Sequence, residues 1–279
     1  MKRHIMAVIK KEMSMKKQVG IIMLLVGLLA PTIFAEIVTE TITYEANGKQ
    51  LKGFLAYNNN IVEKSPVVLI VHEWWGLNEY VKYRAKKTAE LGYVAFALDM
   101  YGNGEYAKHP DDAKGFANLV RNQMDSVGKE RFTAGLNWIQ NHPLVDSDNI
   151  AAIGYCFGGG TVLHMARFGF DLKGVVSFHG GLSTNTPAER GKVKAKVLVC
   201  HGVEDSFVSD EEIDLFKNEM SEAKVDYQFI SYPNALHGFT NPDADKAAEE
   251  FGLGVAYNEK ADQDSWNDMK NFLERVFGE

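Results

Sequence analysis

The chain has 279 residues, 46% hydrophobic and 24% charged, which is close to an average globular protein and excludes a disordered or low-complexity chain. It contains one long apolar run and two cysteines, which excludes a polytopic membrane protein, a disulfide-dense scaffold and a four-cysteine zinc site. The net charge of −7 argues against a nucleic-acid partner, because a surface that binds nucleic acid is basic.

The first 35 residues have the pattern of a secretory signal peptide. Basic side chains precede a short apolar run from Val19 to Ala30, and Ala35 is the small residue typical of a cleavage site. The run is shorter than the roughly 20 apolar residues that span a membrane. An uncleaved anchor is the alternative interpretation, and Met15 is an alternative start. We therefore expect export to the periplasm or out of the cell, without stable membrane insertion after cleavage.

Residues 36–279 predict a single domain, because they contain no repeat and no linker rich in Pro, Gly or Ser. Residues 1–35 hold six basic side chains and one acidic side chain, so the remainder carries 24 basic and 36 acidic side chains, or −12. This charge favours solubility and makes no prediction about oligomeric state.

The predicted elements begin with a hairpin and continue as alternating strands and helices. Thr41–Ala46 and Gln50–Tyr57 flank Asn47-Gly48, a dipeptide that favours a hairpin turn because both turn positions need positive φ. The later strands are short continuous apolar runs, as expected where both faces are buried. These strands are Pro66–Val71, Tyr93–Leu98, Asn149–Gly154, Gly174–Phe178, Val197–Cys200 and Val225–Tyr232. The expected helices are Tyr83–Leu91, Arg131–Gln140, Cys156–Arg167, Asp210–Ala223 and Asp262–Phe277.

This alternation predicts an α/β fold with a mostly parallel sheet and helices on both faces. The active site of such a fold lies at the carboxyl ends of the strands. The residues that follow each strand are therefore the candidates for chemistry.

The strand Asn149–Gly154 leads into Gly154-Tyr155-Cys156-Phe157-Gly158, which matches the G-x-S-x-G nucleophile elbow with Cys in place of Ser. A sharp strand-to-helix turn exposes the central side chain, and the flanking glycines allow close approach of the chain. The start of a helix also favours a thiolate. The alternative is a small buried cysteine in a Gly-rich turn. Cys200 lies inside an apolar strand and is expected to be buried and unreactive.

Two later loops supply partners for Cys156. Asp205 follows the strand Val197–Cys200, and His237 follows Val225–Tyr232, so the order along the chain is nucleophile, acid, base. In this arrangement His237 faces the thiol and Asp205 holds the imidazole in its useful tautomer. Taken singly, Asp205 is equally well a turn residue and His237 a surface histidine. Glu204 and Ser206 are weaker candidates than Asp205.

The loop after Pro66–Val71 begins His72-Glu73-Trp74-Trp75, which places a carboxylate at the mouth of the expected site. The backbone N–H groups of Trp74 and Phe157 would form an oxyanion hole, with one donor from each loop. Trp74 and Trp75 would wall an apolar pocket, or else pack in the core or at the rim.

Together these segments resemble the dienelactone hydrolase family, and the resemblance covers nearly all of residues 40–278. The motifs that carry it are His72-Glu73 with Trp74 to Asn78, Leu98 to Gly102, Gly154 to Gly159, His201-Gly202 with Asp205, and His237-Gly238-Phe239. The resemblance implies an α/β-hydrolase fold and a Cys–His–Asp triad that opens esters or lactones. It assigns Cys156 as nucleophile, His237 as base, Asp205 as the group that orients the base, and Glu73 as the carboxylate that contacts the resting thiol and helps to generate the thiolate.

The chain departs from the family at the substrate. The muconate-pathway enzymes of this family hold a substrate carboxylate with two arginines, in the segments that here contain Asn103 and Asn241 and no arginine. Loss of a charge-assisted hydrogen bond removes roughly 1.5–3 kcal/mol of substrate binding free energy. We therefore expect dienelactone to be a poor substrate and a neutral or differently charged ester or lactone to be preferred. The pocket is expected to be lined by Trp75, Tyr101, Asn103, Phe239 and Asn241.

The predicted reaction is hydrolysis of a small ester or lactone through a thioester acyl-enzyme. The sequence has no metal-ligating pattern, and nothing in it calls for a metal or an organic cofactor. Two alternatives stay open. One is a broader carboxylesterase, thioesterase or acyltransferase on the same triad, and the other is a catalytically silent binding protein on a hydrolase scaffold.

Overall fold

The computed structural model describes residues 36–278, so the predicted signal peptide lies outside the described residues. Within the described part, no helix is both long and apolar enough to cross a membrane. The fold described below is that of the compact unit Ile37–Glu279.

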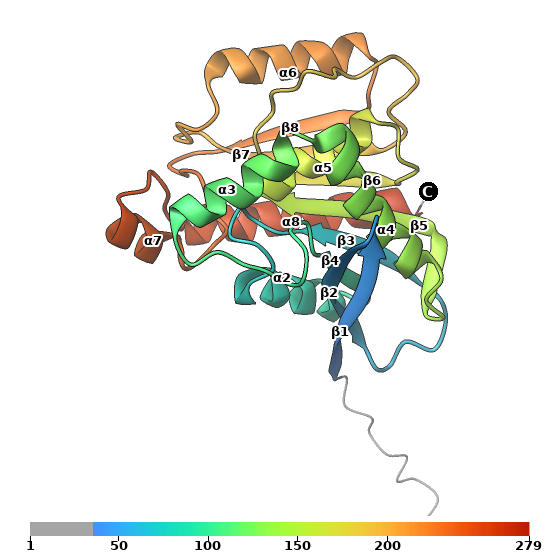
Figure 1. The fold of residues 1–279 in the computed structure, drawn as a ribbon. Coiled ribbons are helices and arrows are strands. Elements are labelled where there is room, and N and C mark those ends of the chain that lie inside the picture. The colour runs from blue at the N-terminus through green and yellow to red at the C-terminus, as the bar shows by residue number, and fades with distance from the viewer. Residues whose placement is uncertain (1–35, 279) are drawn as a thin grey trace, which may run out of the picture. The chain divides into compact units, whose positions relative to one another are not determined.

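An eight-stranded sheet forms the centre of the fold, in the order β1-β2-β4-β3-β5-β6-β7-β8 (Figure 1). The strands are β1 (Ile37–Ala46), β2 (Lys49–Asn58), β3 (Ser65–Val71), β4 (Val94–Leu98), β5 (Val145–Tyr155), β6 (Gly174–Phe178), β7 (Lys196–Gly202) and β8 (Tyr227–Tyr232). Strands β1 and β2 pair antiparallel, β2 pairs antiparallel with β4, and the pairs from β4 through to β8 are parallel. Asn47 and Gly48 form the hairpin turn with φ of 47° and 78°, so both predictions, the hairpin and the mostly parallel sheet, are confirmed.

Helices cover both faces of the sheet, as predicted. They are α2 (Glu79–Glu90), α3 (Pro110–Arg121), α4 (Lys129–Gln140), α5 (Phe157–Arg167), α6 (Asp210–Glu222), α7 (Ala244–Phe251) and α8 (Glu259–Gly278), with a π-helical turn at Met124–Gly128. Successive side chains of β3 point to opposite faces. Val67, Leu69 and Val71 join the core under α4, α5 and α6. Val68 and Ile70 join the core under α2 and α8.

Two helices, α3 and α7, were not predicted from the sequence. Helix α3 buries Ala113, Ala117 and Val120 on one face, and α7 buries Ala244. Both helices are amphipathic, so the apolar periodicity was present in the sequence and was missed. Their ends carry signals as well. Pro110 opens α3 behind the His109 cap, and Gly252, in the left-handed conformation, closes α7.

The parallel strands bring four loops to one edge of the sheet. The carboxyl ends of β3, β5, β7 and β8 lie along the same edge, because these strands belong to one parallel array in the order β3-β5-β6-β7-β8. Glu73, Cys156, Asp205 and His237 follow these strand ends. Residues more than 160 positions apart in the chain can therefore form one site.

The glycines of the elbow are required by close approach of the backbone. A Cβ atom built on Gly154 would lie 2.1 Å from the carbonyl oxygen of Gly158, and one on Gly158 would lie 2.2 Å from the carbonyl oxygen of Val71. Gly154→Ala should therefore lower the free energy of unfolding by at least about 3 kcal/mol, or prevent folding, because backbone atoms cannot move aside cheaply. Urea denaturation followed by circular dichroism measures the change.

Gly115 provides the matched control for that substitution. It lies in α3, and a Cβ atom there meets nothing within 4 Å. Gly115→Ala should raise stability by about 0.5–1 kcal/mol, since alanine favours a helix interior over glycine. Equal effects of the two substitutions would contradict the assignment of a tight elbow.

Candidate active site

Cys156 lies at the turn between β5 and α5 in a strained backbone conformation. Its φ of 53° and ψ of −112° fall outside the regions that ordinary side chains prefer. The turn is held by two backbone hydrogen bonds, from the Cys156 N–H to the Phe178 oxygen at 3.0 Å and from the Gly160 N–H to the Cys156 oxygen at 3.2 Å. This is the geometry of a nucleophile elbow, and it leaves the Cys156 side chain partly exposed.

His237 and Asp205 meet beside the thiol. The His237 Nδ1–H donates to Asp205 Oδ2 at 2.9 Å, and the Asp205 side chain is fully buried. Asp205 Oδ1 accepts the Phe207 N–H at 2.9 Å, so the carboxylate is held from both sides. Because Nδ1 is committed to Asp205, Nε2 is the nitrogen left for Cys156, with which His237 also forms a side-chain hydrogen bond.

The electrostatics of His237 follow from these neighbours. Burial alone lowers its pKa, but the electrostatic interaction with neighbouring Cys156 and the hydrogen bond that His237 donates to Asp205 outweigh burial and raise the pKa to about 10. The charged form of the imidazole is therefore favoured at neutral pH, between Cys156 and the Asp205 carboxylate.

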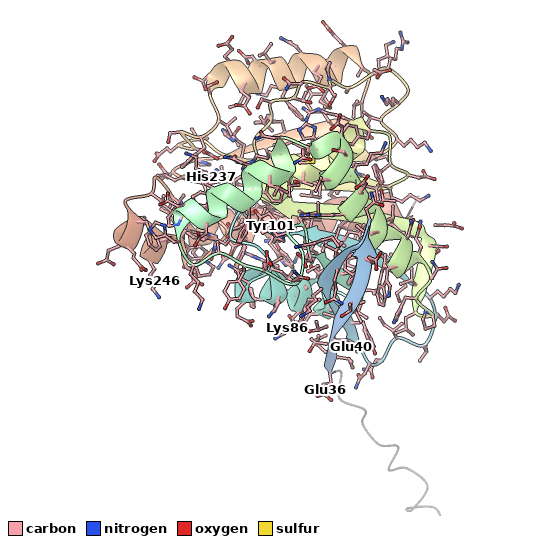
Figure 2. All side chains as sticks on the ribbon, in the orientation of Figure 1. Glu36, Glu40, Lys86, Tyr101, His237 and Lys246 are labelled. Carbon is pink, nitrogen blue, oxygen red and sulfur yellow. The ribbon has the colours of Figure 1, made fainter. Side chains whose placement is uncertain are left out.

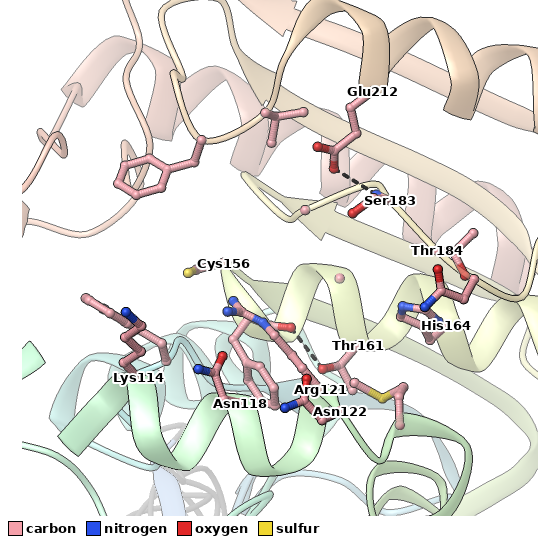
Figure 3. Close-up of a pocket in the computed structure, with 18 of the residues that line it drawn as sticks. Lys114, Asn118, Arg121, Asn122, Cys156, Thr161, His164, Ser183, Thr184 and Glu212 are labelled. Atoms are coloured by element: carbon pink, nitrogen blue, oxygen red, sulfur yellow. Dashed lines mark hydrogen bonds between the residues drawn. The ribbon is translucent and has the colours of Figure 1, made fainter. Parts of the chain in front are cut away.

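Two cavities meet at Cys156. The larger, of about 790 Å³, is lined by one face of α3, by the start of α5 and by the segments at 181–186 and 207–208 (Figure 3). The smaller, of about 310 Å³, lies on the side of α7. Residues shared by both are Trp74, Cys156, His237, Leu253 and Val255. The thiol thus lies at the junction of two spaces, each of a size that holds a small-molecule substrate.

The sequence profile of the dienelactone hydrolase family matches residues 51–277 of the chain. The chain belongs to the dienelactone hydrolase family. A relative from Aquifex aeolicus, named carboxymethylenebutenolidase, is 29% identical over 230 residues, covering 78% of this chain and 96% of its own length. Membership in the family makes the chain a carboxylic-ester or lactone hydrolase.

Solved structures agree with this assignment. A dienelactone hydrolase-like promiscuous phosphotriesterase from metagenomic libraries is 32% identical, with a TM-score of 0.80 over 86% of this chain and 99% of its own. A dienelactone hydrolase from Anabaena variabilis, at 18% identity, a TM-score of 0.56 and coverage of 77% and 95%, shares the fold. The predicted α/β-hydrolase fold is confirmed.

Glu73, the carboxylate that the family resemblance assigns to the resting thiol, contacts a different partner. Its Oε2 accepts a hydrogen bond from Asn241 Nδ2 at 2.6 Å, and no hydrogen bond joins it to Cys156 among residues 36–278. Burial raises the pKa of Glu73 to about 7, although the Asn241 bond and the charges of His237 and Arg84 act in the opposite direction. Glu73 lines the smaller cavity together with Cys156 and therefore lies within the same site.

This raised pKa has a consequence for stability. A carboxyl whose pKa is about 7 in the folded protein and 4.5 when free stabilises the fold below pH 4.5, and the contribution is lost as the pH rises toward 7. Glu73→Gln should therefore raise the free energy of unfolding at pH 8.5 by up to about 3 kcal/mol, with little difference at pH 4.5. Urea denaturation at the two pH values measures it, with the exposed Glu79→Gln as control. A larger gain at low pH would contradict the burial of an ionisable Glu73.

The predicted pocket residues divide into two groups. Trp75 and Asn241 line the smaller cavity. Tyr101, Asn103 and Phe239 line neither cavity, which corrects the expectation for these three.

Each of the three has a physical reason to lie elsewhere. Tyr101 is buried beneath the site, and its hydroxyl donates to the Trp74 carbonyl at 2.9 Å. Phe239 is fully buried and packs against His179 at 5.2 Å between ring centroids. Asn103 adopts a positive φ of 56° in an exposed turn, where its N–H donates to the Gln50 oxygen. The turn is fixed by Asp99, which accepts four backbone N–H groups around it.

The predicted oxyanion-hole residues are Trp74, in the loop after β3, and Phe157, the first residue of α5. Phe157 opens α5, so its N–H has no acceptor within its own helix. Both residues line the larger cavity next to Cys156. The Trp74 and Trp75 rings pack edge to face at 5.0 Å, and Trp75 continues the wall toward Phe251 at 6.2 Å.

A chain of buried hydrogen bonds supports His237 from behind, and sequence analysis did not find it. Arg84 is a donor only, and its Nε donates to the Tyr80 hydroxyl at 3.2 Å. The Tyr80 hydroxyl is hydrogen-bonded to Thr240 Oγ1 at 2.6 Å, and Thr240 Oγ1 is hydrogen-bonded to His179 Nε2 at 2.8 Å. The His179 ring packs edge to face on His237, 5.1 Å between centroids.

The surroundings of His179 decide its charge. Its Nε2 is bonded to Thr240, and its Nδ1 is buried without a partner among the described residues. Burial, with the nearby charges of His237 and Arg84, lowers the pKa of His179 well below its ordinary value. His179 is therefore neutral beside the charged His237.

Thr240→Val should test this support. The substitution keeps the shape of Thr240, which is 1% exposed, and removes the hydrogen bonds of its hydroxyl to Tyr80 and His179. The free energy of unfolding should fall by about 1–3 kcal/mol, and kcat should fall several-fold with KM unchanged, because the loop that carries His237 loosens. Thr240→Ser should restore both. A normal kcat in the valine variant would separate this chain of bonds from the placement of His237.

Proposed function

We propose that this protein hydrolyses a small ester or lactone by nucleophilic attack of Cys156 and passes through a thioester acyl-enzyme. The observation that carries the proposal is the arrangement of the thiol, which lies in a strained elbow and hydrogen-bonds to an imidazole that is itself bonded to buried Asp205. In this arrangement His237 takes the thiol proton, and the resulting ion pair of imidazole and sulfur supplies the nucleophile.

The steps follow from that pairing. The Cys156 sulfur attacks the carbonyl carbon, and the N–H groups of Trp74 and Phe157 stabilise the oxyanion that forms. His237, which carries a proton in the ion pair, gives it to the leaving alkoxide as the carbon–oxygen bond breaks and the thioester remains. His237 then takes a proton from water, whose oxygen attacks the thioester. The acid is released and the Cys156 sulfur leaves as a thiolate, which restores the pair.

The substrate differs from dienelactone in charge or in the place of its charge. The two segments in which the resemblance predicts carboxylate-binding arginines contain Asn103 and Asn241 instead. Asn241 has its side-chain amide bonded to Glu73, a carboxylate rather than a cation. This neighbourhood disfavours a carboxylate in the smaller cavity, since like charges repel.

The experiment is a hydrolysis panel of p-nitrophenyl acetate and butyrate, neutral γ- and δ-lactones, and dienelactone, followed by mass spectrometry of the enzyme quenched during turnover. We expect turnover of the neutral compounds, poor turnover of dienelactone, and an acyl adduct on the peptide containing Cys156 that hydroxylamine removes. Turnover without any adduct on that peptide, under conditions in which deacylation is rate-limiting, would contradict the thioester. Efficient hydrolysis of dienelactone would contradict the substrate assignment.

Phosphotriester hydrolysis is a second candidate, supported by the 32% identical relative described as a promiscuous phosphotriesterase. Diethyl p-nitrophenyl phosphate distinguishes a second activity from simple inhibition. Sustained release of p-nitrophenol beyond one equivalent indicates turnover. A single equivalent with a diethylphosphoryl adduct on Cys156 indicates only that the nucleophile reacts.

We further propose that residues 1–35 direct export of the protein, on the support of the basic, apolar and small-residue pattern in that segment. Fractionation of cells that express the full chain, with N-terminal sequencing of the exported form, tests it. An N-terminus near Glu36 is expected. Retention of the full-length chain in the cytoplasm would contradict export.

A further inference from the structure

One face of α3 forms a polar wall of the larger cavity. Lys114, Asn118 and Arg121 are spaced by four and three residues, so they share a face of the helix, and all three line the cavity that contains Cys156. In Figure 3 these side chains rise from α3 into the cavity, with the Arg121 guanidinium on the side of Cys156. The sequence did not predict this helix, so Lys114 and Arg121 were not among the expected site residues.

The two cations of this wall have no acidic partner. Among residues 36–278, neither Lys114 nor Arg121 forms an ion pair or a side-chain hydrogen bond. The Arg121 guanidinium lies over the Phe157 ring at 5.7 Å and interacts electrostatically with Tyr101. That contact holds the charge beside the first residue of α5, where the helix dipole also favours an anion. Two positive features therefore converge on the space in front of the thiol.

The acidic residues of the larger cavity do not cancel this charge at the thiol. Glu212 accepts the N–H groups of Leu182 and Ser183 at 2.6 and 2.7 Å on the opposite wall. Asp125 belongs to the π-helical turn beyond the end of α3. Burial lowers the pKa of His164, the remaining titratable wall residue, to about 4, so it is neutral at pH 7.

The smaller cavity has the opposite character near the thiol. Three carboxylates, Glu73, Asp243 and Glu250, line it with two lysines, Lys108 and Lys246, and Asn241 is bonded to Glu73. In Figure 2, Lys246 lies on α7 and His237 in the loop that leads to it. The segment after His237 in which the family resemblance predicts an arginine contains Asn241, which lines this smaller cavity. The cations of α3 are on the other side of Cys156.

We propose that α3 and the start of α5 form an anion subsite in the larger cavity, so that the substrate is an ester or lactone with a negatively charged group on the Arg121 side of its reacting carbonyl. The statement about the substrate rests on the proposed function, whereas the anion subsite itself does not. Arg121 is its main ligand, Asn118 and the helix N-terminus donate hydrogen bonds, and Lys114 adds charge at greater range.

Alkylation of Cys156 by a charged and an uncharged reagent tests the subsite without any substrate. Iodoacetate and iodoacetamide both react as the sulfur attacks the methylene carbon and iodide leaves, and only iodoacetate carries an anion. The ratio of their rates cancels changes in the reactivity of the thiolate. Cys200 is fully buried and will not compete in the folded protein. We expect a higher ratio for the protein than for glutathione, and a fall of about 10-fold or more in Arg121→Gln, as for loss of a charge-assisted hydrogen bond.

Two further variants make the result specific. Lys260→Gln, at an exposed ion pair on α8, changes the net charge by the same amount and should leave the ratio as in wild type. Lys246→Gln removes a cation of the smaller cavity. An unchanged ratio in Arg121→Gln, or an equal fall in Lys246→Gln, overturns the proposal.

Hydrolysis then identifies which part of the substrate carries the charge. Two pairs of esters are compared. p-Nitrophenyl hydrogen glutarate carries the charge on its acyl part, and p-nitrophenyl pentanoate is its neutral partner. 4-Acetoxybenzoate carries the charge on its alcohol part, and 4-acetoxybenzamide is its neutral partner. At least one anionic compound should lose kcat/KM about 10-fold or more in Arg121→Gln, with its neutral partner changed less than about twofold. Equal losses on charged and neutral partners overturn the inference. Absence of turnover dependent on Cys156, with the alkylation ratio as expected, overturns the proposed function and leaves the subsite.

Discussion

Cys156→Ala should lower kcat/KM for p-nitrophenyl butyrate by about 10⁴-fold or more, because in the proposed mechanism the Cys156 sulfur forms the acyl-enzyme bond. The variant should fold normally. Alanine keeps the Cβ atom that the elbow accommodates, and the turn is held by the backbone bonds to Phe178 and Gly160 rather than by the side chain. Initial-rate kinetics on purified enzyme, with thermal unfolding as a check on the fold, measure the effect.

Cys200→Ala is the matched control for that result. Cys200 is the second cysteine, fully buried in β7, and burial raises the pKa of its thiol to about 12. Its sulfur accepts a hydrogen bond from the Tyr232 hydroxyl at 3.5 Å, so a modest loss of stability is expected with kcat/KM within about twofold of wild type. Residual activity in Cys156→Ala above one hundredth of wild type would require another nucleophile.

Asp205→Asn should lower kcat by about 10³- to 10⁴-fold. The carboxylate is fully buried and accepts the His237 Nδ1–H at 2.9 Å. An amide that turns its NH₂ toward Nδ1 would favour the other tautomer and leave Nε2 with the proton. Loss of the negative charge also removes one of the causes that raise the pKa of His237, so that pKa should fall.

The expected fall in the pKa of His237 can be measured from the pH dependence of Cys156 alkylation. In wild type the charged imidazole persists up to about pH 10, and alkylation of Cys156 should show the ionisation of His237 near that value. In Asp205→Asn the same inflection should move to lower pH. Glu204→Gln is the control, since the neighbouring Glu204 is exposed whereas Asp205 is buried. A comparable loss in Glu204→Gln would show that sequence analysis ranked the two acids in the wrong order.

Much of the fold could be predicted from the sequence because its signals are local. Asn47-Gly48 fixes a tight turn by the conformations it allows, and continuous apolar runs such as Pro66–Val71 indicate strands buried on both faces. Gly154 and Gly158 flank Cys156 at the spacing that an elbow needs. Once the strands are known to be parallel, the residues after their carboxyl ends must meet at one edge, which is why Cys156, Asp205 and His237 could be grouped without coordinates.

Other features of the site depend on contacts between segments distant in sequence, so they could be identified only in the tertiary structure. Glu73 accepts a hydrogen bond from Asn241, 168 residues away, and the Phe239 side chain is buried in the core. Thr240 joins Tyr80 to His179 because α2 and two strand ends pack around one buried point.

Helix α3 shows the physical reason most clearly. Its apolar residues recur at helical spacing, but its polar face acquires a role only when packing places it across a cavity from Cys156. Local patterns therefore sufficed to predict the proposed reaction centre, whose residues follow strand ends. The tertiary structure decided what surrounds that centre, because the walls of a pocket come from elements that no short-range pattern relates to one another.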